Sequence, residues 1–125
     1  MKDRITVIGA WVIGGSVVRS ILKSKYQGMI TVAEIMEEKG KELEVLGVSV
    51  TGDNRKASRE ADIIFLCVKP NIVKTVLKQI GKEAEGKLVI STAAAVTVKY
   101  CKNILPKSRF VRIMPNVAIL VQESC

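Results

Sequence analysis

Histidine is absent from the 125-residue sequence. This absence excludes catalytic triads with a histidine base, metal sites with histidine ligands and a histidine general base. The three cysteines, Cys67, Cys101 and Cys125, lie far apart and include no C-x-x-C pair. They predict neither a metal site nor a disulfide framework, so we expect a reduced chain in the cytoplasm.

Aromatic residues are scarce, at 4% of the chain, which is too few for a surface that stacks nucleic-acid bases. The net charge is +8, and residues 63–125 hold ten basic residues against three acidic ones. A solvated basic face is the simplest explanation, a site for a phosphate-bearing cofactor is the next, and nucleic acid is the least favoured partner. With 48% hydrophobic and 26% charged residues, the composition indicates one globular domain, residues 1–125.

No hydrophobic run reaches the roughly 20 residues that span a bilayer. The run from Ile5 to Val18 resembles the core of a signal peptide, but Asp3 precedes it and no small-x-small cleavage site follows. We therefore predict no membrane segment. The run is better interpreted as a buried strand, Ile5–Ile8, which turns at Gly9 into a helix.

Short apolar strands alternate with helical segments along the rest of the chain. The predicted strands are Ile5–Ile8, Met29–Val32, Val48–Val50, Ile63–Val68, Leu88–Ile90 and Phe110–Ile113. The predicted helices are one opening at Gly14-Gly15, Glu37–Leu46, a short one capped by Asp53 or Asn54 that runs to Glu60, one along 72–80 and one along 98–105. We expect Pro70 to end the fourth strand, because proline has no amide hydrogen for the ladder. The pattern predicts an α/β, Rossmann-like, doubly wound and mainly parallel sheet, with Ile5–Ile8 and Ile63–Val68 at its centre.

The turn after the first strand, Gly9 to Gly14, reads GAWVIG and carries two of the three glycines of a dinucleotide fingerprint. Gly9 allows the tight turn and Gly14 allows close packing of helix on sheet, whereas Trp11 stands where a glycine would let the backbone approach a pyrophosphate. Glu34 ends the second strand 20 residues after Gly14. Its carboxylate can accept hydrogen bonds from ribose hydroxyls, which slightly favours NAD over NADP. An acid that leads into a helix is the alternative explanation.

The segment Cys67-Val68-Lys69-Pro70 follows the fourth strand, and its end lies at the same edge of the predicted sheet. A lysine at this position can meet a phosphate or a substrate carboxylate, and the alternative is a solvated lysine. We interpret Cys67 as a small strand residue, since no base is present to activate it.

Three longer segments share a resemblance to a known family: Ala61–Pro70 (ADIIFLCVKP), Val89–Thr97 (VISTAAAVT) and Arg112–Asn116 (RIMPN). In this order and spacing they resemble the amino-terminal domain of pyrroline-5-carboxylate reductase, from Ile5 to about Val121. The resemblance implies an oxidoreductase of proline biosynthesis. Such an enzyme reduces 1-pyrroline-5-carboxylate, a small cyclic imine acid, to proline with NADH or NADPH.

The resemblance also implies cofactor-binding positions, while the catalytic residue stays unknown. The backbone of the first turn would contact the pyrophosphate, Glu34 and Asn54 would lie near the adenosine, and Asn116 near the reacting ring. The two remaining segments, Val68–Pro70 and Thr92–Ala94, would line the path to the nicotinamide. The full set is Ile8, Gly9, Trp11, Val12, Ile13, Gly14, Glu34, Asn54, Val68, Lys69, Pro70, Thr92, Ala93, Ala94 and Asn116.

The chain departs from the family pattern at Trp11 and Ala95, where the family has glycine, and at Val117-Ala118, where it has Thr-Pro. Members of the family continue into a helical domain that forms the dimer and holds much of the substrate site. We therefore expect this chain to lack full activity, to bind the cofactor weakly and to self-associate through Met114–Val121. Two alternatives stay open: a non-catalytic Rossmann-like sensing or interaction domain, and a reductase with another hydride acceptor, such as a deazaflavin or a short hydroxy acid.

Overall fold

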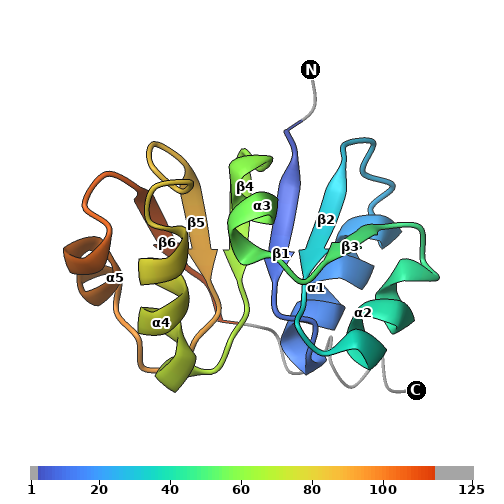
Figure 1. The fold of residues 1–125 in the computed structure, drawn as a ribbon, viewed down its shortest axis with the longest axis horizontal. Helices are drawn as coiled ribbons and strands as arrows, with labels where there is room; N and C mark the ends of the chain where they lie inside the picture. Colours follow the sequence, from blue (N-terminus) through green and yellow to red (C-terminus); the bar gives the residue numbers. More distant parts are fainter. Residues whose placement is uncertain (1–2, 115–125) are drawn as a thin grey trace.

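Residues 3–114, the part of the chain that the computed structural model describes, form one six-stranded sheet with helices on both faces (Figure 1). The spatial order is β3-β2-β1-β4-β5-β6, and every pairing is parallel. The strands are β1 (Ile5–Ile8), β2 (Ile30–Ala33), β3 (Ser49–Thr51), β4 (Ile63–Leu66), β5 (Leu88–Ser91) and β6 (Arg109–Arg112). The predicted Rossmann-like sheet is confirmed, and so is the central place of β1 and β4.

The central strands are apolar at every residue except Thr6, because both of their faces are covered. The buried Thr6 hydroxyl donates to the carbonyl of Ala57 (2.8 Å). All four residues of β1 are buried, and Ile5 stands in register with Ile30 of β2 and Ile63 of β4. A side chain of β1 therefore packs against a helix whichever way it points. At the edge, β6 has Phe110 partly buried and its other three residues exposed.

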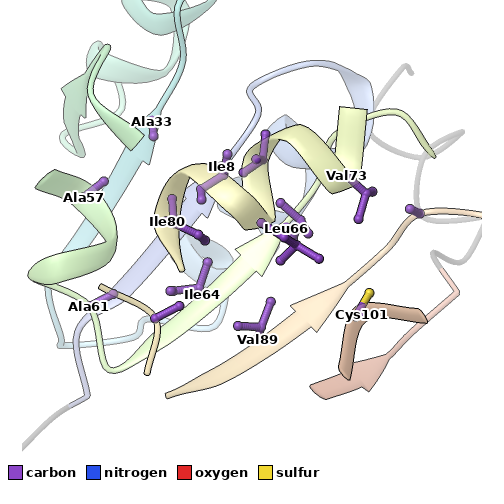
Figure 2. Packing of buried hydrophobic residues seen from close by; sticks show 14 of the residues in the cluster. Ile8, Ala33, Ala57, Ala61, Ile64, Leu66, Val73, Ile80, Val89 and Cys101 are labelled. Atoms are coloured by element: carbon purple, nitrogen blue, oxygen red, sulfur yellow. The ribbon is translucent and has the colours of Figure 1, made fainter. Parts of the chain in front are cut away.

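Two buried clusters show which helices cover which face. The helices are α1 (Val12–Lys23), α2 (Glu37–Glu44), α3 (Asn54–Arg59), α4 (Pro70–Ile80) and α5 (Val98–Ile104). On one face, Val18 of α1 and Leu43 of α2 pack with Val7 and Val32 of the sheet. On the other face, α3, α4 and α5 pack over β1, β4 and β5 (Figure 2); the labelled residues include Ile8, Ala57, Ile64, Leu66, Val73, Ile80, Val89 and Cys101.

Three of the predicted boundaries were wrong in instructive ways. The fourth strand ends at Leu66 rather than Val68, and Pro70 is the first residue of α4 instead of a strand terminator. Proline suits that first helical position because its missing N–H would have no partner there. Helix α1 begins at Val12, ahead of the predicted glycines, and α2 ends at Glu44 instead of continuing to Leu46.

Asp53 caps the short helix α3, which settles the choice left open between Asp53 and Asn54. Its carboxylate accepts hydrogen bonds from the backbone N–H groups of Arg55 (3.0 Å) and Lys56 (3.1 Å). Within residues 3–114, no helix has the length and apolar character that crossing a membrane requires. Asn116, Val117-Ala118 and most of the apolar segment predicted to self-associate lie outside the described residues.

Candidate functional site

The carboxyl ends of the strands meet at the lower edge of the sheet in Figure 1, where α1 and α4 begin. In parallel α/β sheets ligands bind beyond this edge. Four segments with predicted site residues meet here: the β1–α1 turn, the end of β2, residues 67–70 and residues 92–95. Their placement at one edge follows from the parallel order of β2, β1, β4 and β5.

The two glycines that frame the first turn are required by its geometry. Gly9 has φ +99°, and a Cβ at this position would lie 2.6 Å from the carbonyl oxygen of Cys67. A Cβ at Gly14 would lie 1.7 Å from the carbonyl oxygen of Gly9. No side chain fits at either position, so the tight turn and the close helix packing both depend on glycine.

At Trp11, in the middle of the turn, the backbone does not require glycine. Trp11 is the residue before α1, with φ −71° and ψ −170°, and its side chain is 48% exposed. Two ammonium groups face its ring: Nζ of Lys39 lies 5.3 Å from the ring centroid and Nζ of Lys69 lies 5.8 Å from it. Distances of this size permit a cation–π attraction. The glycine missing from the fingerprint is therefore replaced by a surface ring that is flanked by positive charge.

The N-terminus of α1 has neither a side-chain cap nor an acidic residue in its first turn. The N–H groups at the start of a helix have no acceptor within the helix, and the helix dipole places partial positive charge there. Val12 and Ile13 belong to this first turn, with Val12 exposed and Ile13 half-buried, whereas Ile8 lies in the core. The start of α1 therefore favours an anion such as a phosphate.

Glu34 ties the end of β2 to the first turn. Its side chain is only 8% exposed, and its two carboxylate oxygens accept hydrogen bonds from the backbone N–H groups of Ala10 (2.7 Å) and Met36 (2.9 Å). Sequence reasoning missed this clamp, although an acid at a strand end beside an N–H-rich turn was a signal for it. Each oxygen keeps a second acceptor position, so the carboxylate can still meet a ribose hydroxyl.

The region after β4 contains an unreactive thiol, that of Cys67. Burial raises the pKa of Cys67 to about 11, although a hydrogen bond with Thr92 acts in the opposite direction. Thr92 is itself buried, and its backbone N–H donates to the carbonyl of Leu66 (3.2 Å). A neutral thiol is a poor nucleophile, which agrees with our interpretation of Cys67 as an unreactive residue. Its predicted place in the strand was wrong, because β4 ends one residue earlier, at Leu66. Val68 is half-buried beside Cys67, while Lys69 is exposed.

The turn after β5 contains the second departure from the family pattern. Ala93 is buried and Ala94 is exposed. Ala95 has φ +61°, a conformation that side chains rarely adopt and that glycine adopts freely. A shallow hollow beside it is lined by Pro70, Ala95, Val96, Thr97 and Tyr100. Sequence reasoning did not single out Tyr100, because nothing in the pattern places the first turn of α5 next to Pro70.

Asn54, the first residue of α3, makes a contact with another helix. Its side-chain amide donates to Gln79 Oε1 (2.9 Å) and so links α3 to α4. Within residues 3–114, no group of three or more His, Cys, Asp or Glu residues is arranged to hold a metal ion. The site that the structure assembles is therefore built from the first turn, Glu34 and the segments after β4 and β5.

Comparison with known proteins decides the family. The family described as "NADP oxidoreductase coenzyme F420-dependent" matches residues 4–95. The chain belongs to this family. Among curated proteins, the chain is 36% identical over 131 residues to pyrroline-5-carboxylate reductase from Methanosarcina acetivorans, an alignment that covers 98% of this chain and 47% of that protein. The chain thus spans about half the length of the curated relatives that it matches.

Solved structures agree with this assignment. A pyrroline-5-carboxylate reductase from Coxiella burnetii superposes with a TM-score of 0.87 at 35% identity, over 98% of this chain and 47% of that one. A Plasmodium falciparum pyrroline carboxylate reductase with NADP bound has a TM-score of 0.82 at 20% identity, over 95% of this chain and 44% of that one, a likeness of fold alone. The resemblance found in the sequence is confirmed: the chain corresponds to the amino-terminal domain of these reductases. The comparisons do not favour the non-catalytic alternative.

Proposed function

We propose that this chain is the dinucleotide-binding domain of a reductase that transfers hydride from NADH or NADPH to 1-pyrroline-5-carboxylate and forms proline. The observation that carries the proposal is the first turn, where Gly9 and Gly14 hold the uncapped start of α1 beside the carboxylate of Glu34. This arrangement suits a dinucleotide, whose pyrophosphate carries negative charge and whose ribose carries hydroxyl groups. Relatives with NADP or NAD+ in their solved structures support it.

In this proposal the chain's own residues bind and orient the cofactor, and the cofactor supplies the hydride. Glu34 accepts from the adenosine ribose and repels a 2′-phosphate, which places NADH ahead of NADPH. Asn54 lies toward the adenosine half. The nicotinamide side is lined by Val68, Lys69, Pro70, Thr92, Ala93 and Ala94. Holding the ring against the imine carbon supplies most of the rate, through proximity and orientation.

Trp11 limits the affinity of this site. A side chain at the middle position keeps the pyrophosphate from close contact with the turn backbone, so two hydrogen bonds to a charged group are lost. Such a loss costs about 3–6 kcal/mol, or on the order of 10²–10⁴ in affinity. We therefore expect NADH and NADPH to bind weakly, and we expect Trp11→Gly to restore binding with NADH ahead.

Calorimetric titration of both nucleotides into the parent chain and into Trp11→Gly tests this proposal. Trp11→Leu is the matched control, because it removes the indole but keeps a side chain at the same backbone position, and it should show no gain. Micromolar binding by the parent chain would contradict the role given to Trp11. The absence of any gain in the glycine variant would contradict the cofactor site itself.

The proposal also names a substrate and a cellular location. The small-molecule partner is the cyclic imine acid, and the location is the cytoplasm. Oxidation of NADH that depends on 1-pyrroline-5-carboxylate, measured as the loss of NADH absorbance, distinguishes this acceptor from an oxidised deazaflavin or from the keto acid that corresponds to a short hydroxy acid, each offered to the same protein. Self-association through residues 114–121 stays a prediction.

A further inference from the structure

Two lysines from distant parts of the chain both place their ammonium groups over the ring of Trp11, beside the first turn. Lys39 comes from α2, and its Nζ lies 5.3 Å from the ring centroid. Lys69 comes from the junction of β4 and α4, and its Nζ lies 5.8 Å from the same centroid. Together the two distances limit the separation of the ammonium nitrogens to about 11 Å.

The charges around this cluster leave the lysines available to an anion. Nζ of Lys39 lies 3.9 Å from Glu42 Oε1, at the outer limit of an ion pair, and the Lys39 side chain is 34% exposed. Lys69 is exposed and has no acidic partner among residues 3–114. Glu34, the acid that is hydrogen-bonded to the first turn, is held by the N–H groups of Ala10 and Met36. A ring face attracts an ammonium group weakly, so a phosphate oxygen can take its place.

We propose that Lys39 and Lys69 hold the pyrophosphate of the dinucleotide with their side chains, and that Trp11 is the platform that keeps both ammonium groups in place. The proposal rests on the proposed function and deepens it by naming the groups that replace the backbone contact. Trp11 keeps the phosphates away from the turn, so they bind farther from the backbone. Long lysine side chains can reach a phosphate there as mobile point charges.

In this proposal, the residues that set the affinity for the dinucleotide differ from the residue that sets the preference between NADH and NADPH. Both nicotinamide dinucleotides contain the same pyrophosphate, so the lysine pair contributes equally to NADH and NADPH. The preference between them stays with Glu34, which meets the ribose. Because exposed charges are screened by salt, the lysine contribution falls as the ionic strength rises.

The experiment uses inorganic pyrophosphate as the probe, at low ionic strength. Trp11 is the only tryptophan of the chain, so its fluorescence reports binding at the site, and calorimetry gives the affinity independently. Lys39→Gln and Lys69→Gln should each weaken pyrophosphate binding about three- to tenfold. Lys78→Gln is the matched control, because it removes the same charge from an exposed position of α4, and it should leave the affinity unchanged.

NADH and NADPH titrations of the same variants provide the second measurement. Each lysine variant should weaken the two nucleotides by the same factor, and both factors should shrink in a Trp11→Gly background, where the backbone is open again. Lysine variants that bind pyrophosphate as well as Lys78→Gln does would overturn the proposal. A loss confined to NADPH would also overturn it, because the lysines would then contact the 2′-phosphate.

The outcomes keep this inference apart from the proposed function. Suppose that Trp11→Gly binds NADH tightly while the lysine variants bind pyrophosphate normally. The dinucleotide site then stands and the lysine pair is wrong. If pyrophosphate binding depends on both lysines but neither the parent nor Trp11→Gly binds NADH, the anion site stands and the proposed function is wrong.

Discussion

The turn after β1 and the turn after β5 each carry a side chain where the resemblance found in the sequence implies glycine, yet the two side chains have different physical consequences. Trp11 has an ordinary backbone conformation, with φ −71°, and a large half-exposed ring. Ala95 has a small side chain but a φ of +61°. In our proposal Trp11 therefore occupies space that the pyrophosphate needs, whereas the positive φ of Ala95 strains the protein itself.

The comparison shows that a glycine can be required for two independent reasons, and that sequence alone does not say which applies. Gly14 adds the extreme case, because a Cβ there would lie 1.7 Å from Gly9 O. In the first turn, close packing allows only glycine at the two ends, whereas the backbone conformation in the middle accepts any residue. In the turn after β5, the positive φ in the middle is what favours glycine.

Gly14→Ala should have the largest effect on the protein, because its Cβ would overlap backbone that cannot move aside. We expect a loss of more than about 4 kcal/mol in the free energy of unfolding, measured by urea denaturation. Gly15→Ala is the matched control. A Cβ at Gly15 would lie 2.9 Å from the end of the Arg19 side chain, which can shift, and in ordinary contact, at 3.7 Å, with the carbonyl oxygen of Ala10. Equal denaturation midpoints for the two variants would show that the end of the turn is not fixed by packing.

Cys67 lies between the two turns and reports on both of them. With a pKa of about 11 against an ordinary 9.0, its thiolate fraction at pH 8 is lower by about 100-fold, and iodoacetamide should label it correspondingly slowly. A variant that retains only this cysteine allows the rate to be followed by mass spectrometry. Because the folded pKa is raised, Cys67 contributes stability that is fully present below pH 9 and is lost as the pH rises through 11.

Labelling of Cys67 at the rate of an unfolded control at pH 8 would contradict the closed packing of the two turns. Trp11→Gly should leave this rate unchanged, because the ring of Trp11 lies at the surface. Faster labelling in that variant would mean that Trp11 also shields the core. Packing would then constrain the middle of the first turn as well as its two ends.

Ala95→Gly should have the smallest effect, and it should be stabilising. Removal of the side chain relieves the strain of the positive φ, while the added freedom of the unfolded chain offsets part of the gain. We expect about 0.5–1 kcal/mol, a rise of roughly 3 °C in the melting temperature measured by circular dichroism. Ala94→Gly, at a neighbour without positive φ, is the matched control and should lower the melting temperature.

Much of the fold could be predicted, because nearly continuous apolar runs such as ITVI and IIFL are what a doubly covered strand requires. The errors fell at boundaries. Cys67 and Val68 continue the apolar run of β4, and the backbone N–H of Cys67 still donates to the carbonyl of Ile8 (2.9 Å), although the strand has ended. Composition alone does not reveal where such a ladder stops.

Sequence could predict the positions of site residues that a local pattern marks, but not the contacts between them. Gly9 and Gly14 could be assigned from their spacing, and Glu34 from its place at the end of a strand. The hydrogen bond from Ala10 to Glu34 and the approach of Lys39 to Trp11 depend on how α2 and the first turn pack in space. No periodicity in the sequence records such contacts.

The central place of β1 affects how the chain acquires its structure. This strand precedes the other five strands of the sheet in the sequence, yet one of its two partners is β4, and the contact between Arg4 and Asp62 joins residues that are 58 apart. Loops of such length close slowly, which delays sheets of this topology relative to helical proteins. Until β4 arrives, β1 exposes an unpaired apolar edge, so the yield of refolding should fall as protein concentration rises.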